Sequence, residues 1–334
     1  MLAPKFWYPE NNEKSFSSLA LIPFGHIYSL LSKLRMSKAV KKQFDIPIVC
    51  IGNLNAGGTG KTPTTISAAE FLRDRKYNVH IVSRGYGGNA MGPLSANDTE
   101  HSADDVGDEA LMLSAFAPTW VATKRSDGIQ SAIKEGADII LLDDGFQDPS
   151  VYKDLSILTV NAKKGFGNNR CIPAGPLREK LSNGLERADV LISIGTETSQ
   201  RTFKSIYKSY INMPLGIANL EVLNTGLSLE NMKVLAFAGI AHPENFFDTL
   251  RAQGAEIVDY QALADHQKLS STIMKRLIVD ARAKNAQLIT TEKDYMRLPK
   301  EFRSEVMTLP VRIKLNETLS WEKIFKPILS CQGK

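Results

Sequence analysis

Short apolar runs along the chain alternate with segments in which apolar positions recur every three or four residues. Runs such as 46–51, 138–142 and 190–194 have few polar interruptions, which is typical of strands buried on both faces of a parallel sheet. The segments between them have the spacing of amphipathic helices. Strands that alternate with helices predict βαβ units, and therefore an α/β fold whose sheet is mostly parallel and flanked by helices.

The same pattern sets the expected elements and their order. Up to residue 200 it predicts strands at 46–51, 78–83, 120–123, 138–142, 154–160 and 190–194, and helices at 64–73, 108–117 and 128–135. Further on it predicts strands at 215–223, 234–238, 256–260 and 287–290, and helices at 243–253 and 270–284. Residues 89–106 are polar and predict a loop.

The regularity of this alternation divides the chain into four parts. With 334 residues, the chain is long enough for two domains that each bury a core. We expect an N-terminal segment at 1–44, a core at 45–200, a linker with strands at 201–232, and a smaller C-terminal α/β domain at 233–334 that packs back on the core.

A glycine-rich loop follows the first predicted strand and precedes a predicted helix. It is a G-x-x-x-x-G-K-[ST] pattern with one departure, because Asn55 stands at the first glycine position. In such a loop, backbone N–H groups surround phosphate oxygens, the lysine reaches the β- and γ-phosphates and the hydroxyl holds magnesium. The predicted nucleotide-binding residues are Asn55, Ala56, Gly57, Gly58, Thr59, Gly60, Lys61 and Thr62. The sequence therefore predicts a P-loop NTPase-like core.

Two carboxylates follow the apolar run at 138–142. Asp143 and Asp144 are expected at the carboxyl edge of a buried strand, which is where ligands bind in an open parallel sheet. One carboxylate at that edge can hold magnesium, directly or through water. A hydrophobic strand that ends in aspartate is common, but the phosphate loop earlier in the chain favours a metal-binding role here.

Several other side chains are candidates for the same edge. Arg84, Tyr86 and Arg125 follow predicted strands, where a cation suits a phosphorylated substrate, and Arg178 lies in a loop fixed by two prolines. Glu292 and Lys293 end a strand of the second half and are candidates to face the nucleotide across a cleft. Asp108 opens a predicted helix, where an acid is also an ordinary cap, and one histidine of five, His266, gives little evidence by itself.

The N-terminal segment combines apolar and basic residues. Residues between Lys14 and Asp45 include no acid, and the apolar positions from Phe24 to Leu34 have helical spacing. The flanking cations are Lys33, Arg35, Lys38, Lys41 and Lys42. Such a helix suits an anionic membrane surface, or else packs its apolar face on the domain. Pro23 and Gly25 interrupt the run, so we expect the segment to lie in the interface without spanning it.

Composition and charge exclude some classes of protein. The three cysteines, Cys50, Cys171 and Cys331, are far apart and have no metal-ligand spacing, which argues for a reducing compartment. No stretch has the length of a transmembrane helix, and no signal peptide is visible. The net charge of +5 is modest, so nucleic acid is not required as a partner.

Taken together, the motifs resemble those of the tetraacyldisaccharide 4'-kinases, the lipid A 4'-kinases of Gram-negative bacteria, over essentially the whole chain. The similar motifs are GNLNAGGTGKTP, SRGYGG, VGDEA, LLDDGFQD, PAGPLRE, ADH and TTEKD, in that order. The resemblance implies that ATP phosphorylates the 4'-hydroxyl of a tetraacylated glucosamine disaccharide 1-phosphate. It also implies a peripheral enzyme on the cytoplasmic face of the bacterial inner membrane, held there by its N-terminal segment, with no protein partner.

The resemblance also implies roles for individual residues. Asp108 and His266 would activate the hydroxyl together with the phosphate-loop lysine, Lys61. Magnesium would lie near Thr62, Asp143, Asp144 and Glu179. Two positions depart from the common family pattern, because Gln267 stands where a second histidine is usual and Ala110 where proline is usual.

Two other classes share a similar loop. Partitioning ATPases carry a lysine just before the glycine pair, where this chain has Ala56, which argues against them. ATP-dependent carboxylase-type or biotin-pathway synthetases have a similar loop, but a basic amphipathic N-terminus has no purpose in them. A requirement for a detergent-solubilised glycolipid acceptor would distinguish these classes from a lipid kinase.

Overall fold

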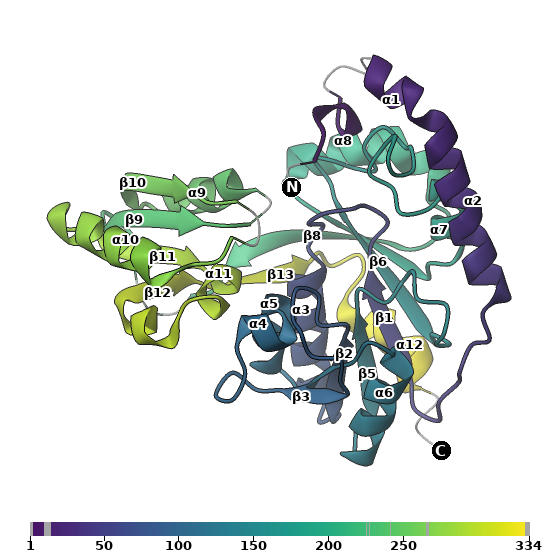
Figure 1. Cartoon of the computed structure of the whole chain (residues 1–334). Coiled ribbons are helices and arrows are strands. Elements are labelled where there is room, and N and C mark those ends of the chain that lie inside the picture. Colours follow the sequence, from purple (N-terminus) through teal and green to yellow (C-terminus); the bar gives the residue numbers. More distant parts are fainter. Residues whose placement is uncertain are drawn as a thin grey trace.

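A computed structural model describes residues 3–9, 15–224, 226, 228–240, 242–264 and 267–330. The chain forms two α/β units, each with its own sheet, and two strands of the larger sheet, β8 and β13, run towards the smaller unit (Figure 1). The P-loop NTPase-like class predicted from the sequence is thus the observed one for the larger unit.

The larger sheet has nine strands in the order β13-β8-β7-β6-β1-β5-β2-β4-β3. Its strands are β1 (Ile48–Gly52), β2 (Val79–Ser83), β3 (Leu94–Ala96), β4 (Thr119–Val121), β5 (Ile139–Asp143), β6 (Leu155–Asn161), β7 (Val190–Ile194), β8 (Leu215–Val222) and β13 (Val311–Leu315). Neighbouring strands are parallel except at the two ends, where β3 pairs antiparallel with β4 and β13 with β8. The central strand β1 is apolar because both faces of the sheet are covered: Ile48 and Cys50 join one core, and Val49 and Ile51 the other.

Helices cover the two faces of this sheet. On one face lie α3 (Lys61–Asp74), α5 (Asp108–Ser114) and α12 (Trp321–Leu329), and on the other α6 (Arg125–Lys134), α7 (Leu181–Glu186) and α8 (Glu197–Tyr207). Short helical turns are α4 (Ala103–Val106), η1 (Lys5–Trp7) and η3 (Lys208–Tyr210). Because β1 continues through the glycine-rich loop into α3, the loop lies at the carboxyl edge of the sheet, as predicted.

The smaller unit has a four-stranded parallel sheet in the order β10-β9-β11-β12. Its elements are β9 (Lys233–Ala238), α9 (Pro243–Ala252), β10 (Glu256–Ala262), α10 (Ser271–Ala283), β11 (Gln287–Thr291), α11 (Glu292–Met296), η4 (Lys300–Glu305) and β12 (Val306–Leu309). Helix α9 buries Phe247 and Leu250 in one core, and α10 buries Met274 and Leu277 in another. The two helices thus cover opposite faces, as expected for right-handed crossovers between parallel strands.

The structure corrects three sequence predictions. The predicted linker at 201–232 contains β8, a strand of the larger sheet, and the end of α8, which packs on that sheet. Residues 311–330, assigned from the sequence to the second domain, return to the first, where β13 extends the sheet and α12 buries Phe325 in its core. The predicted loop at 89–106 contains β3 and α4. For β8 and β13 the local pattern does not specify which sheet the strand joins, because that choice depends on distant partners.

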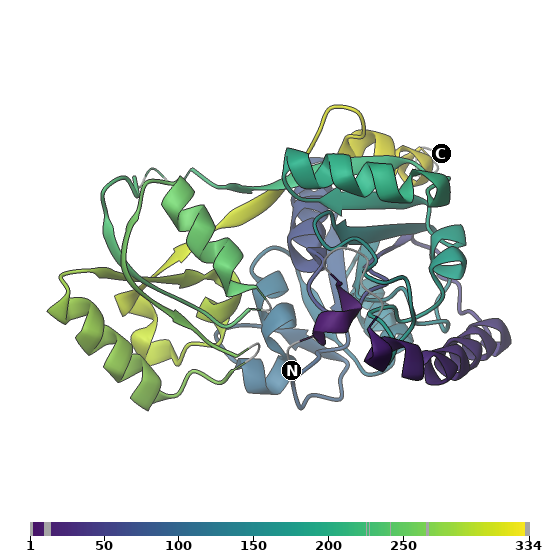
Figure 2. The ribbon, with the colours of Figure 1, turned by 90° about the horizontal axis from the view of Figure 1, so that it is seen from above.

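The N-terminal helices α1 (Phe16–Ala20) and α2 (Ile22–Lys38) lie along the outside of the larger unit (Figures 1 and 2). Gly25, the one buried residue of α2, lies against the Cys171 carbonyl, where an added Cβ would come within 2.9 Å of the oxygen. The apolar side chains of α2 are instead 39–60% exposed: Phe24, Ile27, Tyr28, Leu30, Leu31 and Leu34. The alternative that this face packs on the domain is therefore wrong. None of the helices in the described ranges is long and apolar enough to cross a membrane.

Candidate active site

Hydrogen bonds from a side chain at its start fix the conformation of the phosphate loop. Asn53 donates to the Thr59 hydroxyl at 2.9 Å and to the Gly57 carbonyl at 3.2 Å. Gly60 has a φ of 88°, a left-handed conformation that glycine adopts without strain, and it lets the chain enter α3 at Lys61. The N-terminus of α3 and the backbone of the loop thus point towards one cleft, where they favour an anion.

Asn55 has a different place from the one predicted. Its side chain is buried and donates to the Gly165 carbonyl at 3.1 Å and to the Tyr8 hydroxyl at 3.4 Å. It therefore anchors the loop to the 165 turn and to the N-terminal segment, away from the cleft. The other predicted loop residues, Ala56, Gly57, Gly58, Thr59, Gly60, Lys61 and Thr62, do line the cleft.

The acidic turn follows β5, the strand next to β1. Asp144 adopts a φ of 49° and lies 3.8 Å from the Lys61 ammonium, while Arg178 donates to both of its oxygens at 2.8 and 3.0 Å. Burial opposes ionisation of Asp144, but Lys61 and Arg178 together hold its pKa below the usual value. Lys61, Asp144 and Arg178 all line the cleft, as the sequence predicted.

Asp143 is deeper and has the opposite electrostatics. Its side chain is 2% exposed, and burial, helped by the neighbouring charges of Glu109 and Asp144, raises its pKa to about 7. Its Oδ1 is buried and has no hydrogen-bond partner among the described residues. A buried carboxylate oxygen without a partner is costly unless a cation or donor is bound.

These features fit a magnesium ion. Mg²⁺ in nucleotide sites is held by one or two protein oxygens and completes its shell with phosphates and water. Thr62 lines the cleft at the start of α3, and Asp143 supplies an oxygen that no other described group uses. No cluster of three or more His, Cys, Asp or Glu side chains suited to a metal occurs in the described part of the chain, and this mode of binding needs none.

Glu179 does not join this group. Its two oxygens accept from Arg187 at 2.6 and 2.7 Å, and one also accepts from Gln147 at 3.2 Å. The carboxylate is 5% exposed and lies outside the cleft lining. Through these contacts Glu179 supports the loop that carries Arg178, and its role as a metal ligand stays a prediction.

Arg125 is also a support. It is 2% exposed and donates to Asp148 at 3.0 Å and to the carbonyls of Asp143 and Asp144 at 3.2 and 2.8 Å. Despite partial burial, hydrogen bonds from Ser150 and the charge of Arg125 lower the pKa of Asp148 to about 2. Arg125 therefore fixes the acidic turn from behind and is not part of the cleft lining, and its role as a substrate ligand stays a prediction.

The two remaining predicted substrate ligands differ in whether they line the cleft. Tyr86, 78% exposed, lines the cleft beside Gly87. Arg84 is exposed but is not part of the cleft lining. Of the four predicted substrate ligands, Tyr86 and Arg178 are thus the two that the structure brings to the cleft.

Asp108 faces the smaller unit across the cleft. It begins α5, where its Oδ1 accepts from the Glu109 amide at 2.9 Å. Its Oδ2 lies 3.8 Å from both the Lys293 ammonium and the Arg297 Nε. Asp108 is thus a buried acid at the contact between the two units, which we call the seam. His266, the predicted partner of Asp108, lies outside the described residues.

The predicted nucleotide ligands of the smaller unit also meet this seam. Lys293 donates to Glu109 at 3.1 Å, and Glu292 accepts from Arg312 at 3.0 and 3.1 Å. Arg312 also donates to Glu70 of α3 at 3.1 Å, so it ties α11 to the phosphate-loop helix. Glu292 and Lys293 both line the cleft, but their ion pairs join the two units. Sequence reasoning missed Arg297 and Arg312, which carry no motif signal of their own.

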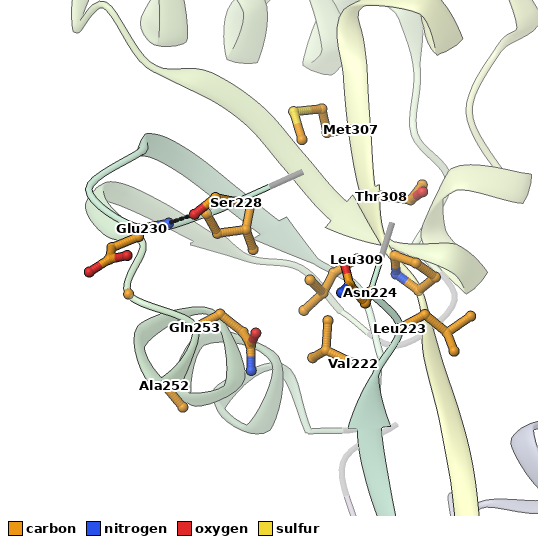
Figure 3. Close-up of a pocket in the computed structure, with 13 residues that line it drawn as sticks. Val222, Leu223, Asn224, Ser228, Glu230, Ala252, Gln253, Met307, Thr308 and Leu309 are labelled. Atoms are coloured by element: carbon orange, nitrogen blue, oxygen red, sulfur yellow. Dashed lines mark hydrogen bonds between the residues drawn. The ribbon is translucent and has the colours of Figure 1, made fainter. Parts of the chain in front are cut away.

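The cleft itself has a volume of about 1280 Å³. It extends from the phosphate loop to the loops that follow the strands of the smaller sheet, which meet it at Ile240, Leu269 and Thr291. A second cavity of about 540 Å³ lies where the chain passes between the units, lined by Leu223, Glu230 and Leu309 among others (Figure 3). The described residues that line it include no phosphate-binding loop, so we assign the chemistry to the large cleft.

A strand–loop–helix phosphate site with carboxylates at the end of the adjacent strand defines a P-loop phosphotransferase or nucleotidase. Comparison with known proteins specifies which. The family model for tetraacyldisaccharide-1-P 4'-kinase matches residues 17–329. The chain therefore belongs to the tetraacyldisaccharide 4'-kinase family, and the kinase activity that the sequence resemblance implied is confirmed.

Individual relatives agree with the family model. The tetraacyldisaccharide 4'-kinase of Jannaschia sp. (strain CCS1) is 49% identical over 317 residues, which cover 95% of this chain and 96% of that protein. The enzyme of the same name from Dinoroseobacter shibae is 46% identical and covers 94% of each chain. The crystal structure of the "apo" form of LpxK from Aquifex aeolicus in complex with ATP has a TM-score of 0.76 at 25% identity, covering 94% of this chain and 99% of that one.

Proposed function

We propose that the large cleft binds ATP with magnesium and transfers the γ-phosphoryl group to the 4'-hydroxyl of a tetraacylated glucosamine disaccharide 1-phosphate at a membrane surface. The observation that carries the proposal is the shared cleft: the phosphate loop and Asp144 line it from one unit, and Asp108 lies at the seam with the other. Phosphoryl transfer requires mainly positioning and charge stabilisation, which this arrangement supplies.

The phosphate loop and the acidic turn have complementary tasks. Lys61 neutralises charge on the transferred group, and its approach to Asp144 keeps the ammonium at the cleft. Arg178, held by Asp144, is a second cation for the developing negative charge. Thr62 and Asp143 or Asp144 would hold magnesium, which would supply electrostatic stabilisation of the negative charge that develops during phosphoryl transfer.

Asp108 is the candidate general base. A sugar hydroxyl is a poor nucleophile at neutral pH, so an acceptor for its proton assists the attack, typically by about 10²–10⁴-fold. Asp108 is 4% exposed and lines the same cleft as the phosphate loop. The family resemblance pairs it with His266, which lies outside the described residues.

Helix α2 supplies the proposed membrane contact. An acceptor with four acyl chains has negligible free concentration in water, so the kinase must meet it at a lipid surface. The exposed apolar face of α2 has basic residues beside it and no acid between Lys14 and Asp45. Each basic residue near an anionic leaflet contributes about 1 kcal/mol. These features support a peripheral location on the cytoplasmic face of the inner membrane.

Replacing Ile27, Leu31 and Leu34 by Ser tests this contact. Because the three side chains are exposed, the variant should keep its melting temperature and its affinity for ATP, but it should no longer sediment with anionic vesicles. Raised salt should weaken the binding of the unaltered protein, because it screens the basic residues. Unchanged vesicle binding of the Ser variant would refute the membrane role of α2.

The reaction itself is tested with labelled ATP and the purified disaccharide 1-phosphate in detergent. The account predicts label on the 4'-position of the glycolipid, and no turnover of ATP that is independent of the acceptor. Release of inorganic phosphate without a labelled lipid would instead favour a partitioning-type ATPase, and an adenylated or acyl-phosphate product a synthetase.

A further inference from the structure

Arg297 joins the loops of the smaller unit at their meeting with the larger one. It directly follows α11 and is 7% exposed. Its Nη2 pairs with Asp294 and donates to the Gly239 carbonyl at 2.8 Å, and its Nη1 donates to the Gln267 carbonyl at 3.4 Å. Gly239 and Gln267 lie in the loops that follow β9 and β10, and Asp294 lies in α11, which follows β11. One guanidinium thus joins two loops and a helix at the carboxyl edge of the small sheet.

The remaining nitrogen of Arg297 points across the seam. Its Nε is buried and has no hydrogen-bond acceptor among the described residues. It lies 3.8 Å from Oδ2 of Asp108, which is too far for a hydrogen bond. A relative movement of only about 1 Å would bring the two atoms within hydrogen-bond distance. Leaving a buried donor unsatisfied is costly, so a small closure of the seam gains a strong charge-assisted hydrogen bond.

We propose that Arg297 is a positioning residue for Asp108, and that its Nε–H donates to Oδ2 when nucleotide and acceptor fill the cleft. This inference rests on the proposed role of Asp108 as the base. With Oδ1 held by the Glu109 amide and Oδ2 by Arg297, the carboxylate has one orientation, and a remaining lone pair takes the hydroxyl proton. The smaller unit thereby supplies the group that fixes the base of the larger unit.

Lys293 does not replace Arg297 in this task. Its ammonium is also 3.8 Å from Asp108, but it donates to Glu109 at 3.1 Å and is three times as exposed, at 21% against 7%. A flexible, partly hydrated ammonium contributes charge without a fixed direction, whereas a guanidinium anchored at both Nη atoms points its Nε–H along one line.

The test substitutes Arg297→Lys and uses Arg303→Lys as the matched control. Arg303 crosses the same seam, also has a buried Nε without an acceptor among the described residues, and lies 3.8 Å from Asp98, which takes no part in the proposed chemistry. Lysine keeps the positive charge beside Asp294 but cannot present an Nε–H while pairing with that residue. We expect kcat of Arg297→Lys to fall about 10–100-fold, as for a misplaced catalytic group, with KM for ATP within about threefold. Arg303→Lys should keep kcat within about threefold.

A double mutant separates this inference from the proposed function. If Arg297 acts through Asp108, adding Arg297→Lys to Asp108→Ala should cause no further loss of kcat. Multiplying losses, or normal kcat in a folded Arg297→Lys protein, would overturn the inference and leave the base assignment intact. Full activity of Asp108→Ala alone would instead overturn the base assignment. If Arg297→Lys melts well below Arg303→Lys and loses ATP affinity in proportion, Arg297 has a structural role only, and the inference is likewise overturned.

Discussion

The phosphate side and the acceptor side of the cleft are built differently. On the phosphate side, Lys61, Asp143 and Asp144 lie on or beside two adjacent parallel strands of one sheet. On the acceptor side, Asp108 comes from one unit, and its cationic neighbours Lys293 and Arg297 come from the other. The first arrangement is fixed as soon as one domain folds, whereas the second depends on how two domains meet. We therefore expect binding of phosphate and activation of the acceptor to be separable in this protein.

The largest expected effect on the phosphate side comes from Lys61→Ala. The ammonium is needed chiefly in the transition state, so kcat should fall by about 10³-fold or more. The far-ultraviolet circular dichroism and the melting temperature should stay close to those of the unaltered protein, because Lys61 lines the cleft and its ion pair with Asp144 is 3.8 Å long. Near-normal turnover by a folded Lys61→Ala protein would remove the main support for the phosphate site.

Arg125→Met tests whether the acidic turn is held from behind. The substitution leaves Asp148 without its buried partner and frees the carbonyls of Asp143 and Asp144. Breaking a buried ion pair by removing one partner typically costs about 3–5 kcal/mol, which should appear in the urea midpoint of unfolding. Lys124→Met, one residue earlier on an exposed side chain, is the control and should leave the midpoint nearly unchanged. A midpoint for Arg125→Met equal to that of the control would mean that the guanidinium has no structural role.

The pH dependence of stability tests the environment of Asp143, with metal and nucleotide removed. Its pKa is raised to about 7 in the folded protein, against an ordinary value of 3.8. Between these values the folded state holds a proton that the unfolded state has lost, so this group makes the free energy of unfolding fall as pH rises from about 4 to 7. The contribution is on the order of 2–4 kcal/mol. Asp143→Asn should remove it, and a difference between the two proteins that stays constant with pH would contradict the assignment.

The same contrast explains how far the sequence could be read. The phosphate loop and the acidic turn are continuous in sequence, and the residue types that the chemistry requires stand at fixed spacing after apolar strands. It was therefore possible to predict that both lie at the carboxyl edge of the sheet, and to predict the bounds of most elements to within a few residues. The surroundings of Arg125 and Glu179 could not be predicted. A charged side chain serves as a ligand or as a support according to its neighbours, and the sequence does not show that Asp148 lies beside Arg125 or that Arg187 lies beside Glu179.

Long-range pairing accounts for the other differences between the sequence predictions and the structure. Val311–Leu315 has an ordinary strand pattern, and only its antiparallel pairing with β8 reveals that the chain returns to the first unit. Arg297 belongs to no conspicuous motif, and its position opposite Asp108 follows from the packing of α11 against α5. Such residues become visible only when the two units are placed together.

The most direct test of the separation between the two sides is a paired measurement on Asp108→Ala, with kcat for the glycolipid on one hand and the dissociation constant of ATP on the other. The account predicts that kcat falls by about 10²–10⁴-fold, as expected when a general base is removed, while ATP affinity changes by less than about threefold. Loss of ATP affinity in parallel with kcat would show that the acceptor side and the phosphate side form one site, and would contradict the account.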